Sequence, residues 1–154
     1  MEAYVDADYA GNMDTRKSLS GFVFTLYGMT ISWKANKKYV VTLSTTQAEY
    51  ISLVKGVKEV IWLKGMIGEL GITQKCVKIH CDSQSVTNLA NHQVYHERTK
   101  HIDIHLLFVI DMIESKEIVV EKMASEENPA DVFTKSLPRS KFKHCLDLIK
   151  FVEK

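Results

Sequence analysis

An acidic residue inside a strand-like stretch is the feature that most constrains the fold of this chain. Residues 1–11 read MEAYVDADYAG, and apolar and polar residues alternate there around Asp6 and Asp8. Tyrosine and valine favour a strand, whereas aspartate is depleted from strands. A carboxylate in a buried strand needs compensation, usually from a metal ion or a cationic side chain. We therefore expect a central strand that carries a metal ligand, with further ligands supplied by later segments.

Length and composition narrow the class of protein. The chain has 154 residues, of which 45% are hydrophobic and 25% charged, and its formal net charge is +1. This length predicts one domain over residues 1–154, and the charge balance argues against a disordered or strongly basic protein. A nucleic-acid partner would therefore require a local cluster of positive charge.

Cysteine usage and hydropathy predict an intracellular protein. Three cysteines without a CxxC pair indicate neither a disulfide framework nor a zinc site, so we expect reduced thiols. No apolar run approaches the ~20 residues of a membrane span, and no signal peptide precedes the first acidic strand. The expected setting is a cytoplasmic particle or the nucleus, with no membrane partner.

Hydrophobic periodicity predicts five strands and several helices. An antiparallel meander comes first, because short turns join strands expected over residues 3–9, 18–27 and 29–34. Ser44 and Gln47 form a capping-box pattern, which predicts a long helix from Thr45 to Glu69. The later strands and helices are expected over residues 77–81, 83–90, 99–115, 117–122, from 129, and over 140–152. Two strand-to-helix successions place a later strand parallel to the meander, which gives a mixed α/β sheet with helices packed over it.

Three further acids stand where such a fold can bring them to Asp6. Glu49 is expected in the first turn of the long helix, Asp82 at the end of a strand and Asp131 near the start of a late helix. Strand ends and adjacent helix starts can converge at one site in a mixed sheet. Crowded carboxylates bind protons or a divalent cation, and oxygen ligands suit Mg²⁺ or Mn²⁺. Two such ions can activate a water and stabilise a leaving oxygen in phosphodiester cleavage.

Each of these acids also has a purely structural explanation. The helix dipole favours Glu49 and Asp131 near helix N-termini, and Asp82 could cap the helix that follows it. This explanation is weakest for Asp6, which has strand neighbours on both sides. Asp8 shares a face with Asp6 if the strand is regular, yet we interpret it as a turn or outer acid. If the four acids crowd together, a neutral isostere at any of them should raise the stability of the metal-free protein.

Seven motifs follow one another in an order that resembles a known family. They read YVDADYAG, SLSGFVF, SWKANKK, LSTTQAEY, CDSQS, RTKHIDI and NPADVFTKSL, and they cover nearly the whole chain. In these motifs the chain is similar to the ribonuclease H domain of copia-type LTR-retrotransposon polyproteins. The resemblance implies a ribonuclease H-like fold, with a five-stranded mixed sheet in the order 3-2-1-4-5 flanked by helices. It also implies hydrolysis of the RNA strand of RNA–DNA hybrids with Mg²⁺ or Mn²⁺.

The resemblance also assigns roles to the four acids. It implies that Asp6 bridges two metal ions and that Asp131 shares the second of them. It further implies that Glu49 and Asp82 hold the ion used by the attacking water. Cellular type 1 enzymes carry a histidine in the loop before the last aspartate, whereas residues 123–128 here contain none. That role is therefore absent or filled from elsewhere in the chain.

Candidate substrate contacts are polar groups beside the acids and one basic segment. Arg98, Lys100 and His101 lie in a histidine-rich stretch, and we expect Arg98 and Lys100 to contact phosphates. His101 and His105 could instead hold zinc on a helix face, but neither an HEXXH motif nor a third soft ligand supports this. Neutral groups that could bind 2′-hydroxyls are Asn12, Thr46, Gln47, Ser83 and Gln84, of which Ser83 and Gln84 rank first.

The leading hypothesis is an active endonuclease that binds RNA–DNA hybrids, with a reverse transcriptase domain as partner in a longer polyprotein. A non-catalytic hybrid-binding remnant of the same fold is the main alternative, and an integrase or junction resolvase is a third. The intact set of carboxylates favours catalysis, since binding alone does not need acids near negatively charged phosphates. Of the two tryptophans, we expect Trp33 in the core and Trp62 in the core or at an interface.

Overall fold

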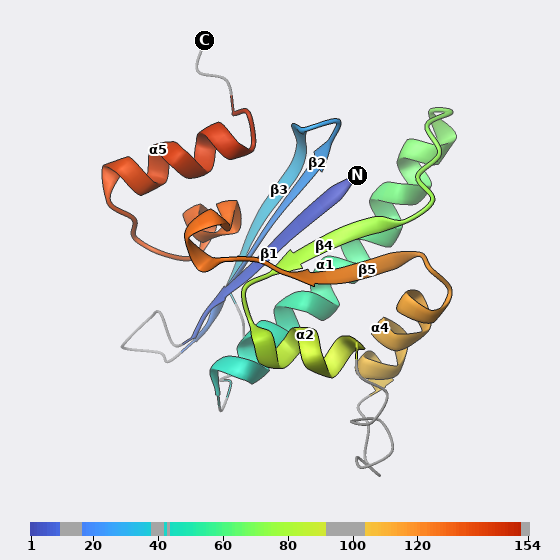
Figure 1. The fold of residues 1–154 in the computed structure, drawn as a ribbon, viewed down its shortest axis with the longest axis horizontal. Coiled ribbons are helices and arrows are strands. Elements are labelled where there is room, and N and C mark those ends of the chain that lie inside the picture. Colours follow the sequence, from blue (N-terminus) through green and yellow to red (C-terminus); the bar gives the residue numbers. More distant parts are fainter. Residues whose placement is uncertain (10–16, 38–41, 43, 92–103, 152–154) are drawn as a thin grey trace.

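Five strands form one mixed sheet in the order β3-β2-β1-β4-β5 (Figure 1). The structure is a computed structural model and describes residues 1–9, 17–37, 42, 44–91 and 104–151. The strands are β1 (Glu2–Asp8), β2 (Leu19–Leu26), β3 (Met29–Lys37), β4 (Val77–Cys81) and β5 (Ile118–Lys122). This confirms the predicted fold class and strand order, with β1 at the centre of the sheet.

Pairing within the sheet explains why β1 is central. β1 is antiparallel to β2 and parallel to β4, and β4 is parallel to β5. The predicted meander and parallel addition are therefore both present. In the β1–β2 register Asp6 lies opposite Gly21. The third strand runs to Lys37, three residues beyond its predicted end.

Four α-helices and two short 3₁₀ helices complete the described part of the chain. They are α1 (Thr45–Glu69), α2 (Gln84–Asn91), α4 (Ile104–Glu114), η1 (Ser125–Glu127), η2 (Pro129–Phe133) and α5 (Arg139–Leu148). The Ser44 hydroxyl accepts a hydrogen bond from the Gln47 N–H at 3.1 Å, so α1 begins where the capping pattern predicts. The helix expected from Pro129 is a 3₁₀ helix that ends at Phe133.

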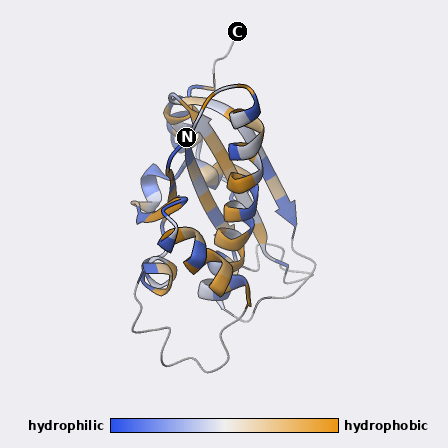
Figure 2. Cartoon of the chain, turned by 90° about the vertical axis from the view of Figure 1, so that its right-hand side faces the viewer, coloured by the Kyte–Doolittle hydropathy of each residue, from blue (hydrophilic) through white to orange (hydrophobic). Residues whose placement is uncertain are grey.

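The two faces of the sheet are covered by different elements. Alternate residues of a strand point to opposite faces, so Ala3 and Val5 of β1 join the larger core with α1, α2 and α4. Tyr4 faces the other way and packs on a smaller cluster of Val23, Ala130 and Ile149, beside η2 and α5. Figure 2 shows the apolar residues gathered on the strands and on the helices that cover them. Because Asp6 has the parity of Tyr4, it faces η2.

Two glycines let helices approach the central strands closely. A Cβ at Gly56 of α1 would lie 2.6 Å from Cγ1 of Val5, which is too close for a real contact. A Cβ at Gly21 of β2 would lie 2.8 Å from the carbonyl oxygen of Ala130 and 2.8 Å from Cγ2 of Thr134. The missing side chain at Gly21 therefore allows η2 to lie directly on the sheet beside Asp6.

The prediction for the tryptophans is wrong as far as the core is concerned. Trp33 of β3 is 52% exposed, and Trp62 of α1 is 60% exposed. α1 packs over β1 and β2, which leaves the edge strand β3 largely uncovered. The Trp33 ring meets Phe151 edge-on, with ring centroids 5.4 Å apart. Within the described part of the chain, no helix combines the length and apolar character needed to cross a bilayer.

Candidate metal centre

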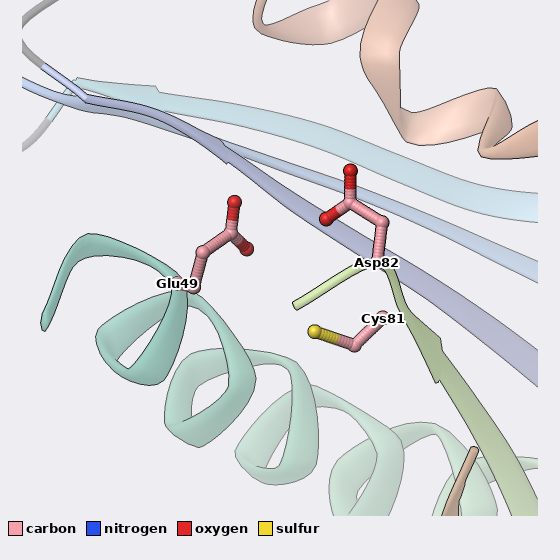
Figure 3. A group of neighbouring side chains, drawn as sticks. All are labelled: Glu49, Cys81 and Asp82. Atoms are coloured by element: carbon pink, nitrogen blue, oxygen red, sulfur yellow. The ribbon is translucent and has the colours of Figure 1, made fainter. Parts of the chain in front are cut away.

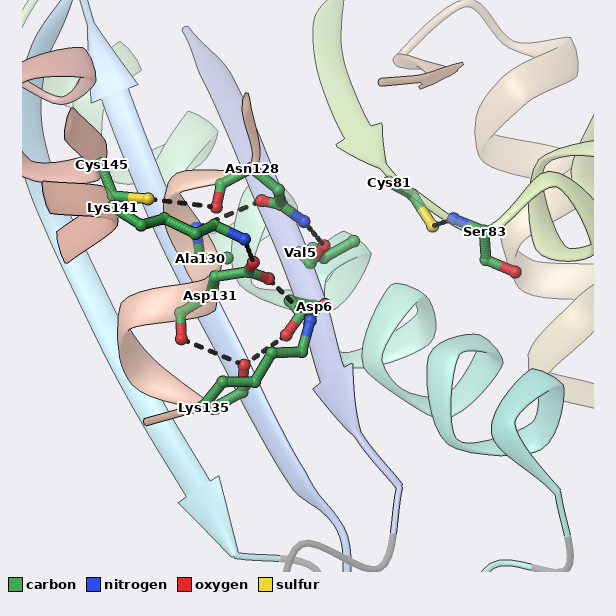
Figure 4. A network of polar contacts seen from close by, with 11 residues as sticks. Val5, Asp6, Cys81, Ser83, Asn128, Ala130, Asp131, Lys135, Lys141 and Cys145 are labelled. Carbon is green, nitrogen blue, oxygen red and sulfur yellow. Dashed lines mark hydrogen bonds and ion pairs between the residues drawn. The ribbon is translucent and has the colours of Figure 1, made fainter. Parts of the chain in front are cut away.

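Asp6 is a fully buried carboxylate in the middle of the central strand. Its exposed fraction is 0%, and both of its oxygens have donors from the segment after η2. The Thr134 hydroxyl donates to Oδ2. The Lys135 ammonium lies 3.2 Å from Oδ1, and Figure 4 shows Lys135 beside Asp6 and Asp131. Burial raises the pKa of Asp6 above its ordinary value, although the Lys135 charge opposes that rise. The compensation that a strand aspartate requires is therefore partly supplied by the chain itself.

Asp131 is brought to Asp6 by η2, and Asn128 fixes the position of η2. The Asn128 side chain donates to the Val5 carbonyl at 3.0 Å and accepts from the Ala130 N–H at 3.2 Å. It thereby caps η2 and ties it to the backbone next to Asp6. Asp131 is 1% exposed, and its two oxygens receive Lys135 at 2.8 Å and Lys141 at 2.7 Å.

Glu49 and Asp82 approach the same place from the other side of β1. Asp82 directly follows β4, and Glu49 projects from α1, so that their carboxylates turn toward each other (Figure 3). Glu49 lies in the second turn of α1, which corrects the prediction of the first turn, so the helix dipole does not explain it. Its Oε2 atom is buried and has no hydrogen-bond partner among the described residues. Burial raises the pKa of Glu49 to about 8, and the charges of Asp6 and Asp82 add to the effect.

The four acids form two overlapping groups of donor atoms. One oxygen from each of Asp6, Asp82 and Asp131 lies within 4.8 Å of the others. Donor atoms of Glu49, Cys81 and Asp82 likewise lie within 4.8 Å of one another. Asp82 therefore links the two groups. Asp8, at the end of β1, is in neither group.

Cys81 is an unsuitable ligand in spite of its position. Burial raises the pKa of the Cys81 thiol to about 12 in the metal-free protein, and a soft sulfur donor does not suit a hard divalent cation. Its sulfur accepts a hydrogen bond from the Ser83 N–H at 3.4 Å, which stabilises the turn into α2. The remaining donors are all carboxylate oxygens, and the unpartnered Glu49 oxygen is among them. This donor set fits a hard divalent cation such as Mg²⁺ or Mn²⁺.

Sequence reasoning missed four residues that contact or position these acids. They are Asn128, Thr134, Lys135 and Lys141. Lys135 could have been found, because it lies four residues after Asp131 and such spacing favours ion pairs. Lys141 reaches Asp131 from α5 across a turn, and its spacing gives no comparable signal.

The paired lysines change one expectation about stability. A neutral isostere at Asp131 would remove the partner of two ammonium groups, so it should destabilise the metal-free protein. We still expect a neutral isostere at Glu49 to stabilise the metal-free protein, because Glu49 has no ion pair with a described residue and its pKa is raised.

Some predicted substrate contacts lie within the described residues. Thr46 and Gln47 are exposed at the start of α1, near Glu49 in sequence. Ser83 caps α2, because its hydroxyl accepts from the Val86 N–H at 3.3 Å. Gln84 is exposed, and its amide donates to Asn88 at 2.8 Å. Asn12, Arg98, Lys100 and His101 lie outside the described residues.

A histidine from elsewhere does lie against the loop that precedes Asp131. Nε2 of His144 in α5 is 3.2 Å from both carboxylate oxygens of Glu127 in η1. Residues 123–128 themselves contain no histidine, as the sequence shows. The segment before the last acid is thus contacted by an imidazole that α5 supplies.

Comparison with known sequences finds relatives among transposon polyproteins. The chain is 45% identical over 149 residues to the retrovirus-related Pol polyprotein from transposon TNT 1-94 of Nicotiana tabacum, covering 97% of this chain and 11% of the relative. It is 36% identical over 146 residues to the corresponding polyprotein from transposon RE1 of Arabidopsis thaliana, covering 94% of this chain and 10% of the relative. The chain therefore spans about a tenth of the length of these curated relatives. No family model matches it.

Comparison with solved structures finds the same fold in ribonucleases H. LC11-RNase H1 in complex with an RNA/DNA hybrid superposes with a TM-score of 0.57 at 18% identity, covering 86% of this chain and 92% of that one. The foamy viral protease-reverse transcriptase in complex with an RNA/DNA hybrid gives a TM-score of 0.61 at 10% identity, covering 92% of this chain and 20% of that one. At these identities the likeness establishes the fold.

Proposed function

This chain belongs with the Pol polyproteins of copia-type retrotransposons and has the ribonuclease H fold, and from that premise we propose that it hydrolyses the RNA strand of RNA–DNA hybrids. The observation that carries the proposal is the convergence of Asp6, Asp82 and Asp131 within 4.8 Å. Two of these carboxylates, Asp6 and Asp131, are almost fully buried, and burying acids together with lysine counter-ions is costly enough to indicate a functional site. Glu49 adds a fourth carboxylate with an unpartnered oxygen.

Two divalent ions, Mg²⁺ or Mn²⁺, are the proposed cofactors. Asp6 and Asp131 would hold one side of the pair, and Glu49 and Asp82 would hold the other. Bound there, such ions activate a water and stabilise the leaving oxygen of a phosphodiester. The chain contributes the fixed positions of its carboxylates: Asn128 and Gly21 set η2 against β1, and β4 delivers Asp82.

Selectivity for a hybrid is proposed to come from neutral groups beside the acids. Only the 2′-hydroxyl distinguishes RNA from DNA at a given phosphodiester, and a hydroxyl needs a polar partner that is not only an acceptor. Gln84 is exposed two residues after Asp82, and although its amide donates to Asn88, that group has a second N–H and an acceptor oxygen, so we keep it as the first candidate. Ser83 follows it, because its hydroxyl already caps α2. The proposed partner in a longer polyprotein is a reverse transcriptase domain, because the relatives are Pol polyproteins and one structural neighbour is a protease-reverse transcriptase.

A hybrid-binding module without catalysis is the second candidate. It is favoured by one observation, namely that Lys135 and Lys141 already occupy oxygens of Asp6 and Asp131. A site that is neutralised by lysine side chains has less need of a metal ion. Lysines that stay in the site could also contact the phosphates of a bound hybrid. The two candidates share substrate and fold, so only an assay of cleavage separates them.

Cleavage of an end-labelled RNA–DNA hybrid is the test. We expect RNA-strand products with Mg²⁺ or Mn²⁺, none with a chelator, and none from an all-DNA duplex of the same sequence. Activity should fall with added salt, because phosphate contacts release counterions on binding and a net charge of +1 supplies little attraction to offset this loss. Binding without cleavage under every metal condition would establish the second candidate. Equal cleavage of hybrid and duplex DNA would instead indicate a general nuclease of this fold.

A further inference from the structure

Two lysines fill the Asp6–Asp131 side of the carboxylate cluster. The Lys135 ammonium lies 3.2 Å from Asp6 Oδ1 and 2.8 Å from Asp131 Oδ1, so it bridges the two acids. The Lys141 ammonium lies 2.7 Å from the other oxygen of Asp131. With the Thr134 hydroxyl on Asp6 Oδ2, every oxygen of these two carboxylates has a donor (Figure 4).

These ion pairs differ from ordinary surface pairs in the burial of the acids. Asp6 and Asp131 have exposed fractions of 0% and 1%, whereas the side chains of Lys135 and Lys141 keep 34% and 31%. The carboxylates cannot turn to solvent, so their charges must be met where they are. The lysines can withdraw, because part of each side chain already reaches water and its stem is flexible.

We propose that Lys135 and Lys141 are resident counter-cations of this cluster, which neutralise Asp6 and Asp131 in the metal-free protein and compete with a divalent ion for their oxygens. The inference rests on the proposed metal-dependent function, and it names the chain's own competitor for the metal. A divalent ion should therefore bind less tightly at the Asp6–Asp131 side than at the Glu49–Asp82 side, because it must displace an ammonium group there.

Charge balance supports competition over coexistence. With all groups ionised, the four carboxylates and the two ammonium groups leave two negative charges, which one divalent ion neutralises. A second divalent ion in the presence of both ammonium groups would leave the buried cluster positively charged, and like charges at short range repel strongly there. With the lysines withdrawn, two divalent ions balance the four acids.

The opposite side of the cluster gives an internal reference. Glu49 has a buried oxygen without a partner, and neither Glu49 nor Asp82 has an ion pair with a described residue. An ion that binds there displaces no side-chain cation. Lysine removal should therefore affect binding at the Asp6–Asp131 side more than binding at the Glu49–Asp82 side.

Calorimetric titration of the chelator-treated 154-residue chain with Mg²⁺, in the absence of nucleic acid, tests the proposal. The variants are Lys135→Met and Lys141→Met, which keep the length of the side chain and remove its charge. Lys143→Met is the matched control, because Lys143 is an exposed lysine of the same helix as Lys141 and its removal changes the net charge equally. Lys141→Met is included as a second variant that is less prone to misfold than Lys135→Met, because Lys141 lies on the outer helix α5.

We expect both test variants to bind Mg²⁺ about two- to fivefold more tightly than the native chain, the range for loss of a competing, partly exposed ion pair. The control should bind like the native chain. Lys135→Met should also lower the melting temperature of the metal-free protein, and saturating Mg²⁺ should restore it, because an ion then replaces the lost ammonium.

Unchanged or weaker Mg²⁺ binding in Lys135→Met and Lys141→Met, relative to Lys143→Met, would overturn the proposal, because the lysines would then coexist with the metal or support it. Native cleavage of hybrids together with that result would leave the proposed function standing. Tighter binding without any hybrid cleavage would keep the counter-cations and remove the nuclease. Absence of both Mg²⁺ and Mn²⁺ binding in the native chain and in all variants would overturn the proposed counter-cations, and with no hybrid cleavage it would overturn the proposed function as well.

Discussion

The two sides of the carboxylate cluster are neutralised in different ways. On the Asp6–Asp131 side, lysines and a threonine hydroxyl reach every carboxylate oxygen. On the Glu49–Asp82 side, a glutamate oxygen is buried without a partner among the described residues, and the pKa of Glu49 is raised to about 8. One side is satisfied by the chain, whereas the other depends on a proton or a bound cation.

The two sides therefore contribute differently to the fold and to metal binding. Ion-paired acids help to hold η2 and α5 on the sheet, so they act in the fold as well as in the site. An acid without a cation costs stability in the ionised form and gains most from a metal ion. We therefore expect the Asp6–Asp131 side to respond to mutation as structure, and the Glu49–Asp82 side to respond to pH and metal.

The largest effect is expected where the two sides meet. Asp82 belongs to both groups of donor atoms, so Asp82→Asn should lower the rate of hybrid cleavage at least about a hundredfold. Asp6→Asn should cause a similar loss, because it removes charge from the centre of the cluster. Single-turnover cleavage of a labelled hybrid with Mg²⁺ measures both. Native rates in Asp6→Asn would remove the central role of this acid.

Moving η2 away from the sheet should break the Asp6–Asp131 side alone. Gly21→Ala places a Cβ against the Ala130 carbonyl and should cost about 1–3 kcal/mol in the free energy of unfolding. Gly65→Ala is the control for the steric clash, because no atom lies within 4 Å of its added Cβ, and it should itself raise stability by about 0.5–1 kcal/mol through helix propensity. Urea unfolding with chelator present measures the difference. A Gly21→Ala protein as stable as the control would show that η2 does not need this close approach.

Neutral isosteres on the two sides should change stability in opposite directions. Asp131→Asn leaves Lys135 and Lys141 without their shared partner and should lower the metal-free free energy of unfolding by about 1–2 kcal/mol, allowing for the partial exposure of the lysines. Glu49→Gln removes a half-buried charge without an ion pair among the described residues, so it should raise the metal-free free energy of unfolding. Thermal unfolding in chelator at pH 8 measures both. A gain in both variants would mean that repulsion outweighs the ion pairs.

Raising the pH should weaken the metal-free protein through Glu49. Its pKa is raised from 4.5 to about 8 in the folded state, so within this window the folded protein binds a proton that the unfolded chain has released. Below pH 4.5 both states carry the proton, and the free energy of unfolding therefore decreases as pH rises toward 8.

Glu49→Gln should flatten this decrease by about 1 kcal/mol, after allowance for solvent screening. Glu69→Gln, an exposed glutamate of the same helix, is the control and should keep the native slope. Urea unfolding at several pH values with chelator present gives the slopes. Identical slopes in the two variants would assign the pH dependence to other groups, such as Asp6, whose pKa is also raised.

Local sequence signals predict most of the secondary structure and single out the four acids as candidates. The bounds of α1 and β4 match their predictions, because capping at Ser44, helical periodicity and a short apolar run are local signals. Asp6 stood out because an acid in a strand conflicts with local propensity, and such conflicts mark sites. The order of strands was implied by the resemblance to the ribonuclease H family and is confirmed, whereas local signals predict only a meander with a later parallel strand.

The groups that neutralise these acids depend on tertiary packing and could not be predicted from local signals. The bridge from Lys135 to Asp6 spans nearly the whole chain, and the pairing of Lys141 with Asp131 depends on how α5 packs beside η2. The exposure of Trp33 likewise follows from its place on an edge strand that α1 does not cover. Periodicity reports which face of an element is apolar, whereas the partner of a polar side chain depends on which distant elements meet there.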